Sequence, residues 1–191
     1  MIIGAPLYGP YQTISLNGDY IEVVRDFKYL GSMMTSKTRD IRARKGQAWV
    51  VFWKLKDIWQ AKNISIQLKI RLYKATVLSI LLYGSETWIT NQQQKSMLDS
   101  FATSCYRIML NVKRTDSISN AEIYKRVEQK LLSVTLAKRQ LICVGHILRR
   151  DKTEPISNLA LYRPNHGKAK PGQSGLANIF KMFEYFSLFE I

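Results

Sequence analysis

Short apolar runs in the first thirty positions predict β structure. The runs 13–16 and 20–24 flank Asn17-Gly18. A two-residue hairpin turn needs positive φ at both central positions, which Asn and Gly adopt most easily. A third run covers residues 27–30. The pattern therefore predicts a short N-terminal β hairpin followed by one further strand.

From Lys37 onward, apolar residues recur at the spacing of an α-helix. The first apolar face repeats at intervals of four, three and four: Ala48, Phe52, Leu55 and Trp59. The opposite face of this predicted helix carries basic residues: Arg44, Lys54 and Lys62. Such two-sided patterning is typical of a helix that packs one face on a core.

Four later helices are indicated by capping residues and by apolar spacing. Ser65 is suited to cap the second helix, and Gly84 is suited to end it. Capping boxes are predicted at Thr90–Gln93 and Ser119–Glu122, and they open the third and fourth helices. The third predicted helix has an apolar face made of Leu98, Phe101, Cys105, Ile108 and Val112. The fifth has one made of Ala137, Leu141, Val144 and Leu148. The predicted fold is mainly α, with a short N-terminal β hairpin.

Lysine and arginine are concentrated in two blocks of the chain. The 191 residues include 29 Lys and Arg against 14 Asp and Glu, which gives a net charge of +15. Residues 37–74 carry eleven basic residues against two acids, and residues 113–152 carry ten against four. A concentrated basic field favours a polyanion such as nucleic acid or an anionic membrane surface. The alternative is a basic face that serves only solubility.

Other bulk features exclude several classes of protein. No stretch of 18 consecutive apolar residues is present, so we expect no transmembrane helix and no membrane partner. The first ten residues lack the basic region of a secretory signal. Cys105 and Cys143 lie far apart without a C-x-x-C pattern, which favours a reducing compartment. We therefore expect an intracellular protein, in the cytoplasm or the nucleus.

Three short strings occur in a fixed order along the chain: FKYLGS at 27–32, LLYGSETW at 81–88 and GHILR at 145–149. Together they resemble the C-terminal part of the reverse transcriptase of non-LTR (LINE-type) retrotransposons. Residues 27–32 (FKYLGS) resemble a segment that follows the catalytic strands of that family, and residues 81–88 (LLYGSETW) resemble a string in its thumb. Residues 145–149 (GHILR) resemble a string further on, and Ser119-Asn120 resembles a recurrent polar pair between them. The resemblance covers roughly residues 20–172.

The resemblance implies a division of the chain. Residues 1–36 would be the end of the palm, and residues 37–112 would be a thumb-like helical bundle. Residues 113–152 would be a second, small segment of basic helices, and residues 153–191 a loop and a divergent tail. The primer-grip turn would then include four residues: Phe27, Tyr29, Leu30 and Gly31. Thumbs of this family pack against the template–primer duplex, which agrees with the basic block at 37–74.

The chain departs from the family in its acidic residues. Such a polymerase holds two Mg²⁺ ions with a pair of adjacent aspartates and a third aspartate upstream. No Asp-Asp pair occurs here, and Asp19, Asp26 and Asp40 are isolated. We therefore expect no catalytic residue and no cofactor in this chain, although Mg²⁺ would be implied for an intact enzyme that also had the missing palm and fingers. The favoured function is non-specific binding of RNA–DNA or DNA duplexes; the alternatives are a basic helical adaptor for an acidic protein and a relic without function.

Seven basic residues of the first two predicted helices are candidates for contacts with phosphate: Arg39, Arg42, Arg44, Lys45, Lys69, Arg71 and Lys74. The alternative for each is a solvated helix face. The aromatic residues at helical spacing are expected in the core rather than as stacking platforms, with Trp53 the most exposed.

Two further groups of residues carry candidate chemistry. Cys143 and His146 form a C-x-x-H pair, to which only His166 or the distant Cys105 could add ligands. Structural zinc needs four ligands at suitable spacing, so no metal site is predicted. Glu86 is the sole carboxylate of an apolar stretch, and we expect it to pair with a thumb arginine.

Overall fold

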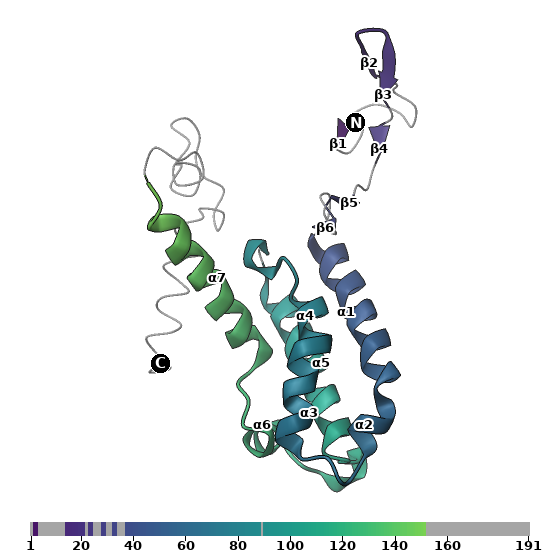
Figure 1. The fold of residues 1–191 in the computed structure, drawn as a ribbon, viewed down its shortest axis with the longest axis vertical. Helices are drawn as coiled ribbons and strands as arrows, with labels where there is room; N and C mark the ends of the chain where they lie inside the picture. Colours follow the sequence, from purple (N-terminus) through teal and green to yellow (C-terminus); the bar gives the residue numbers. More distant parts are fainter. Residues whose placement is uncertain are drawn as a thin grey trace. The chain divides into compact units, whose positions relative to one another are not determined.

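The computed structural model describes residues 2–3, 14–21, 23–24, 28–29, 32–33, 37–88 and 90–151. Within these residues the chain is mainly α-helical, as the spacing of its apolar positions predicts (Figure 1). The helical elements are α1 (Lys37–Lys54), α2 (Lys56–Gln60), α3 (Ile66–Tyr73), η1 (Lys74–Leu78), α4 (Ser79–Leu81), η2 (Ser85–Thr87), α5 (Gln92–Met109), η3 (Arg114–Asp116), α6 (Asn120–Val127) and α7 (Leu132–Leu148). Of these, η1 is a π-helical segment between α3 and α4, and η2 and η3 are single 3₁₀ turns.

The strands are short and pair two by two. They are β1 (Ile2–Ile3), β2 (Ile14–Leu16), β3 (Asp19–Ile21), β4 (Val23–Val24), β5 (Lys28–Tyr29) and β6 (Ser32–Met33). β1 pairs with β4 in parallel, whereas β2 with β3 and β5 with β6 are antiparallel. Between β2 and β3, Asn17 and Gly18 have φ values of 54° and 92°. These positive values are what a two-residue turn of this kind requires.

The chain divides into two compact units. Unit 1 comprises Met1–Gly84 and Trp88–Gln129, and unit 2 comprises Ser85–Thr87 and Lys130–Ile191. α6 belongs to unit 1, because it packs on α5 and α3.

Aromatic side chains fill the core of unit 1. α1 packs on η1, α4 and α5, and its Phe52 is fully buried. The Phe52 ring stacks on Trp59 of α2 at 5.2 Å between centroids and meets Tyr73 of α3 edge-on. Trp49 joins α1 to α5 through Phe101, with ring centroids 5.0 Å apart. Aromatic pairs in these geometries stabilise a core beyond the effect of the area they bury.

The two apolar faces predicted for residues 37–112 are largely buried. The six buried members are Ala48, Phe52, Trp59, Leu98, Phe101 and Cys105. Leu55, Ile108 and Val112 are only half-buried. Leu55 differs because the helix is interrupted there, and Ile108 because it lies at the edge of the buried face of α5.

The interruption at Leu55 separates α1 from α2, where the sequence predicts one continuous helix. The carbonyl of Phe52 accepts a hydrogen bond from the Trp59 indole Nε1 at 2.7 Å and another from the Leu55 amide at 3.1 Å. A continuous helix would pair that carbonyl with the amide four residues ahead, at Lys56. The buried indole takes this acceptor instead, so the chain turns.

Most of the predicted helix starts are found in the structure. The hydroxyls of Ser65 and Ser119 accept hydrogen bonds from the backbone amides three residues ahead. The capping box before α5 lies one residue later than expected, at Asn91–Gln94, with both hydrogen bonds 2.9 Å long. Asn is a better N-cap than the Thr90 of the predicted box, which explains the shift.

Unit 2 is organised around α7. Its buried side chains include Leu132, Leu136 and Ala137. The Gln140 side chain donates a hydrogen bond to the Ser85 carbonyl at 3.0 Å, which fastens α7 to η2. Among the described residues no single helix has the length and apolar character to cross a membrane; only α6 and α7 taken together, with a bend between them, meet that criterion.

Candidate nucleic-acid interface

The seven basic residues expected to contact phosphate differ in their exposure. Four are exposed: Arg39, Arg42, Arg71 and Lys74. Lys45 is half-buried, and Arg44 and Lys69 are each only 6 % exposed. The structure thus supplies surface cations at four positions and places two of the seven in the interior.

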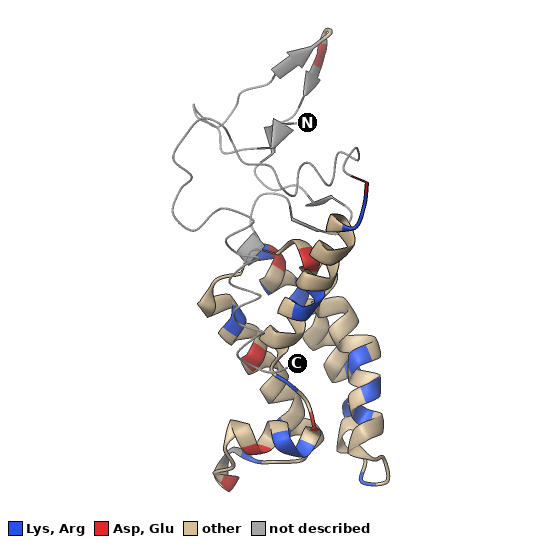
Figure 2. Cartoon of the chain, turned by 90° about the vertical axis from the view of Figure 1, so that its left-hand side faces the viewer, with Lys and Arg blue, Asp and Glu red and all other residues tan. Residues whose placement is uncertain are grey.

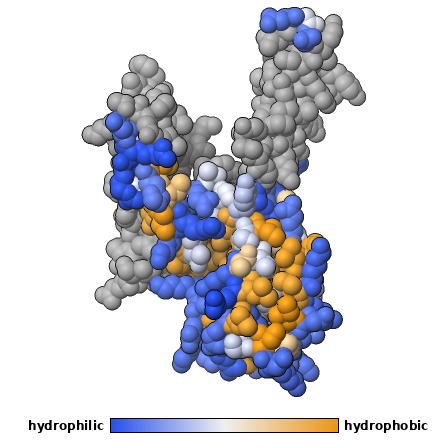
Figure 3. All heavy atoms as spheres, in the orientation of Figure 1, coloured by the Kyte–Doolittle hydropathy of each residue, from blue (hydrophilic) through white to orange (hydrophobic). Residues whose placement is uncertain are grey.

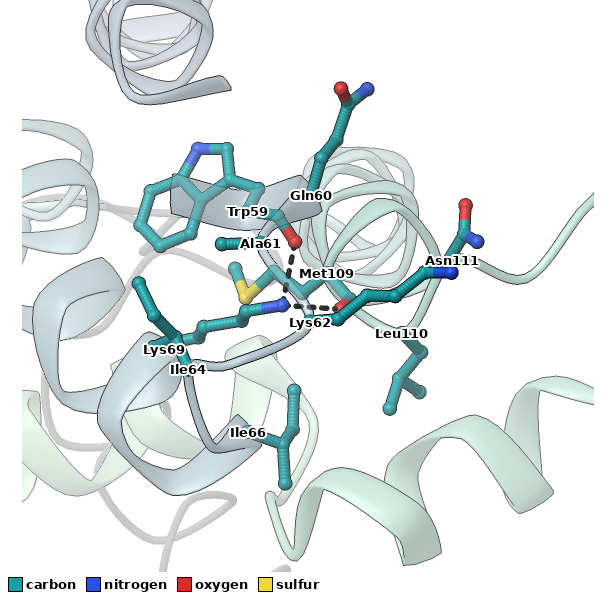
Figure 4. A pocket seen from close by; sticks show the side chains of 10 residues that line it. All are labelled: Trp59, Gln60, Ala61, Lys62, Ile64, Ile66, Lys69, Met109, Leu110 and Asn111. Carbon is teal, nitrogen blue, oxygen red and sulfur yellow. Dashed lines mark hydrogen bonds between the residues drawn. The ribbon is translucent and has the colours of Figure 1, made fainter. Parts of the chain in front are cut away.

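Lys69 is a structural residue inside unit 1 (Figure 4). Its ammonium donates hydrogen bonds to the carbonyls of Trp59 at 2.7 Å and Met109 at 3.4 Å. These carbonyls lie at the C-terminal ends of α2 and α5, where helices leave acceptors unpaired and favour a cation. The ammonium borders a hollow of about 280 Å³ beside Ile66 and Leu110. Burial lowers the pKa of the Lys69 ammonium.

Arg44 is also part of the packing rather than of the surface. Its guanidinium Nε pairs with the Asp40 carboxylate at 3.4 Å, one helical turn earlier, and both side chains are buried. The guanidinium also lies 4.7 Å from the centre of the Tyr83 ring, a cation–π contact. Arg44 therefore joins α1 to the turn that follows α4. The expectation that Arg44 lies on the outward face of α1 is wrong.

The exposed basic surface includes residues that the candidate set omits. Between positions 39 and 74, seven basic side chains are exposed: Arg39, Arg42, Lys54, Lys56, Lys62, Arg71 and Lys74. The single exposed acid in this range is Asp57, because Asp40 is buried against Arg44. Figure 2 shows the Lys and Arg residues, in blue, spread over several helices. Exposure of Lys54 follows from the helical pattern. Lys62 is exposed because it lies in the turn after α2, not on a helix face.

Aromatic residues divide between core and surface largely as expected. Trp59 and Trp88 are buried. Trp53 is exposed, as its position off the apolar line predicts, while Trp49 is half-buried. Tyr83 is exposed on one face and carries Arg44 on its ring. Trp53 is therefore the tryptophan that a ligand at the surface of α1 would meet.

The remaining candidate residues fall partly outside the described residues. Tyr29 lies in β5, while Phe27, Leu30 and Gly31 are outside the described ranges. Within the part of the chain that the structure describes, no three His, Cys, Asp or Glu side chains gather as a metal site would require.

Glu86 forms an ion pair, although not with an arginine of the bundle. Its carboxylate lies 3.4 Å from Arg139 Nε, and Arg139 belongs to α7. Both residues are part of unit 2. The expected partner from 37–112 is thus replaced by one that lies 53 positions later in the sequence.

No protein-family model, no curated protein and no solved structure matches this chain.

Proposed function

We propose that this chain is a relative of the non-LTR retrotransposon reverse transcriptases, without their catalytic aspartates, and that it binds nucleic-acid duplexes through phosphate contacts. The three strings at 27–32, 81–88 and 145–149 support the relationship. The order of elements supports it too, because short strands precede a bundle of helices in both. In this proposal α1 to α5 form the thumb-like bundle and α7 belongs to the basic region that follows.

The observation that carries the binding proposal is the charge of the exposed residues between 39 and 74. Seven exposed Lys and Arg side chains face solvent there against Asp57 alone. Neighbouring acidic side chains would neutralise such a field. The other acid of this range, Asp40, is buried in the bundle and paired with Arg44. A surface of this kind attracts a polyanion.

Phosphate contacts have a measurable thermodynamic consequence. Each cation that neutralises a phosphate releases condensed counterions, so the logarithm of the binding constant falls linearly with the logarithm of the salt concentration. The slope is about −0.9 per contact on duplex DNA. About five contacts would give a slope near −4 to −5. Base sequence should have little effect, since phosphates carry no sequence information.

The test is a fluorescence-anisotropy titration of a labelled RNA–DNA hybrid with the full 191-residue chain at several salt concentrations. Replacing four exposed residues of the 39–74 range, Arg42, Lys62, Arg71 and Lys74, by Gln should reduce the slope by up to about four units. None of these four side chains is buried. The fold should therefore be retained, which far-UV circular dichroism checks.

A variant with equal loss of charge elsewhere provides the control. Lys113, Lys125, Lys130 and Lys138 are exposed and lie outside the 39–74 range. Their replacement by Gln should change the slope less than the first set does. No binding at low salt, or equal effects of the two sets, would contradict the proposed surface.

A further inference from the structure

The face of α1 opposite the core carries an apolar stripe. Its members follow one another at intervals of three, four and three: Ala43, Gly46, Val50 and Trp53. All four are exposed, with Val50 at 58 % and Trp53 at 46 %. Figure 3 shows orange, hydrophobic atoms exposed among blue, hydrophilic ones on the face of the helical region turned to the viewer. A helix at the surface of a globular protein ordinarily has a polar outer face, so this stripe needs an explanation.

The spacing of the stripe is that of a seam between two helices. Alternating intervals of three and four keep apolar side chains in line with a neighbouring helix, as in coiled coils. The other side of α1 already packs on the bundle through Ile41, Ala48 and Phe52, which are fully buried. α1 is therefore apolar on two opposite sides, and only one of them is covered by the described residues.

Gly46 is a second, independent sign of a close neighbour. It lies in the middle of an 18-residue helix, where glycine is disfavoured because it loses the most backbone freedom. A Cβ added at this position would meet nothing within 4 Å. The bundle itself thus gives no reason for a missing side chain. A second helix that approaches closely would, since glycine and alanine let a neighbouring backbone come nearer than the larger Val50 and Trp53 do.

Charge decides which partner fits the stripe. Arg42 lies on one side of it and Lys54 on the other, at about 60° around the helix axis from its centre by the 100° rotation per residue. Arg39, four positions before Ala43, continues the line of the stripe at its N-terminal end. All three are exposed. The acid of α1, Asp40, is buried and paired with Arg44. A second copy of this chain would bring like charges together along the seam, whereas acidic residues on a partner helix would meet Arg42 and Lys54.

We propose that the outer face of α1 binds an amphipathic helix of another protein, with apolar residues at heptad spacing and acidic residues on both flanks. The apolar side chains of that helix would pack over Gly46 between Val50 and Ala43. This inference goes beyond duplex binding and does not depend on it. It gives the chain a protein partner whose recognition depends on shape as well as on charge.

The experiment uses the full chain and a synthetic helical peptide of about four heptads, with Leu at positions a and d and Glu at e and g. The Glu residues keep this peptide from pairing with itself. Binding is measured by anisotropy of the labelled peptide. Gly46→Leu adds a bulky side chain at the proposed point of closest approach without changing charge, and leucine is favoured in a helix, so the variant should fold. We expect it to weaken binding by about tenfold or more.

Matched controls separate packing from charge and from folding. Gln47→Leu adds the same side chain at the neighbouring exposed position, outside the stripe, and should change the affinity by less than about twofold. A peptide of identical composition with its leucines out of heptad order should bind at least about tenfold more weakly.

Three results would overturn the proposal. The first is absence of peptide binding. The second is equal binding by the reordered peptide or by the Gly46→Leu variant, which would leave only non-specific attraction of charges. The third is a dimer of the chain, seen by sedimentation, that Gly46→Leu dissociates, because the occupant would then be a second copy. Binding of the RNA–DNA hybrid is a separate readout, and we expect Gly46→Leu to leave its salt dependence unchanged.

Discussion

Lys69 and Arg44 are buried in the bundle, and oxygen atoms there bind the charged group of each side chain. Lys69 reaches two backbone carbonyls at helix ends, and Arg44 reaches the Asp40 carboxylate. In the sequence Lys69 looks like its exposed neighbours, since lysine at helical spacing ordinarily lies on a solvated face. Arg44 lies four positions before Ala48, in line with the buried face of α1, so helical periodicity itself places it toward the core. What distinguishes them is a set of partners 10 and 40 positions away for Lys69 and a neighbour one turn earlier for Arg44. The distant partners of Lys69 can be identified only from the structure.

Replacement of Lys69 by Met tests its structural role. The variant keeps an apolar stem but leaves the Trp59 and Met109 carbonyls without their donor. We expect the free energy of unfolding to fall by about 1.5–3 kcal/mol, the range for hydrogen bonds to a charged group. Urea unfolding followed by circular dichroism measures this. Arg71→Met, at an exposed position of the same helix, should stay within about 0.5 kcal/mol of the parent chain. Equal, small effects would mean that Lys69 lies at the surface after all.

At the level of elements, local sequence patterns predict the starts of helices but not the break at Leu55. Ser65, Ser119 and Asn91 mark the starts of helices in the sequence, because capping depends on residues three positions apart. The turn at Leu55 contains neither Pro nor Gly, and it arises from the Trp59 indole that competes for a backbone acceptor. Local patterns therefore predict where helices start better than where tertiary contacts break them.

The packing of α5 on α1 depends on Phe101. Its side chain is buried, and its ring lies 5.0 Å from that of Trp49. Phe101→Ala should lower the free energy of unfolding by about 3–5 kcal/mol, because it removes a buried ring and leaves a cavity. Ser104→Ala, at an exposed position of the same helix, is the control and should cost less than about 0.5 kcal/mol. If chemical denaturation showed a loss under about 1 kcal/mol for Phe101→Ala, the two helices would not share this core.

At the scale of the whole molecule, the class of fold follows from the sequence and the grouping of helices does not. The change of apolar spacing near Lys37 predicts a mainly helical chain, and the structure has one. The assignment of α6 to unit 1 depends on contacts such as the hydrogen bond between Tyr124 and Thr103, 3.1 Å long and 21 positions apart. Periodicity carries no information on such pairs. The candidate surface was likewise predictable as a basic block, but not as a set of exposed side chains.

The stability of unit 1 should fall in alkaline solution. Burial raises the pKa of Tyr73, of Cys105 and of Tyr106 in the folded chain. Above about pH 9–10 the unfolded chain releases these protons and the folded chain does not, so unfolding becomes more favourable as the pH rises. The loss approaches about 1.4 kcal/mol per pH unit for each group. Burial also raises the pKa of Tyr124. Lys69 acts in the opposite direction, because its lowered pKa makes the folded chain release its proton first, but it is one group against these four.

The measurement is the free energy of unfolding from urea titrations at pH 8, 9.5, 10.5 and 11. Tyr106→Phe removes one titrating group and should flatten the decline above about pH 10 by roughly 1.4 kcal/mol per pH unit. The parent chain and the variant differ by a single hydroxyl, so their core packing is closely matched. Parallel pH profiles for the two would contradict the assignment of Tyr106 as a buried, protonated phenol.

The path of the chain through unit 2 has a practical consequence for dissecting this protein. Unit 2 takes three residues, Ser85–Thr87, from the middle of the segment that otherwise builds unit 1. A truncation after Gln129 would therefore leave Ser85 and Glu86 behind while it removes Gln140 and Arg139, the side chains that bind them. The two halves of a chain cut at this point would each keep one side of a broken contact. We expect them to behave as complementary fragments, as in a split reporter, rather than as independent domains.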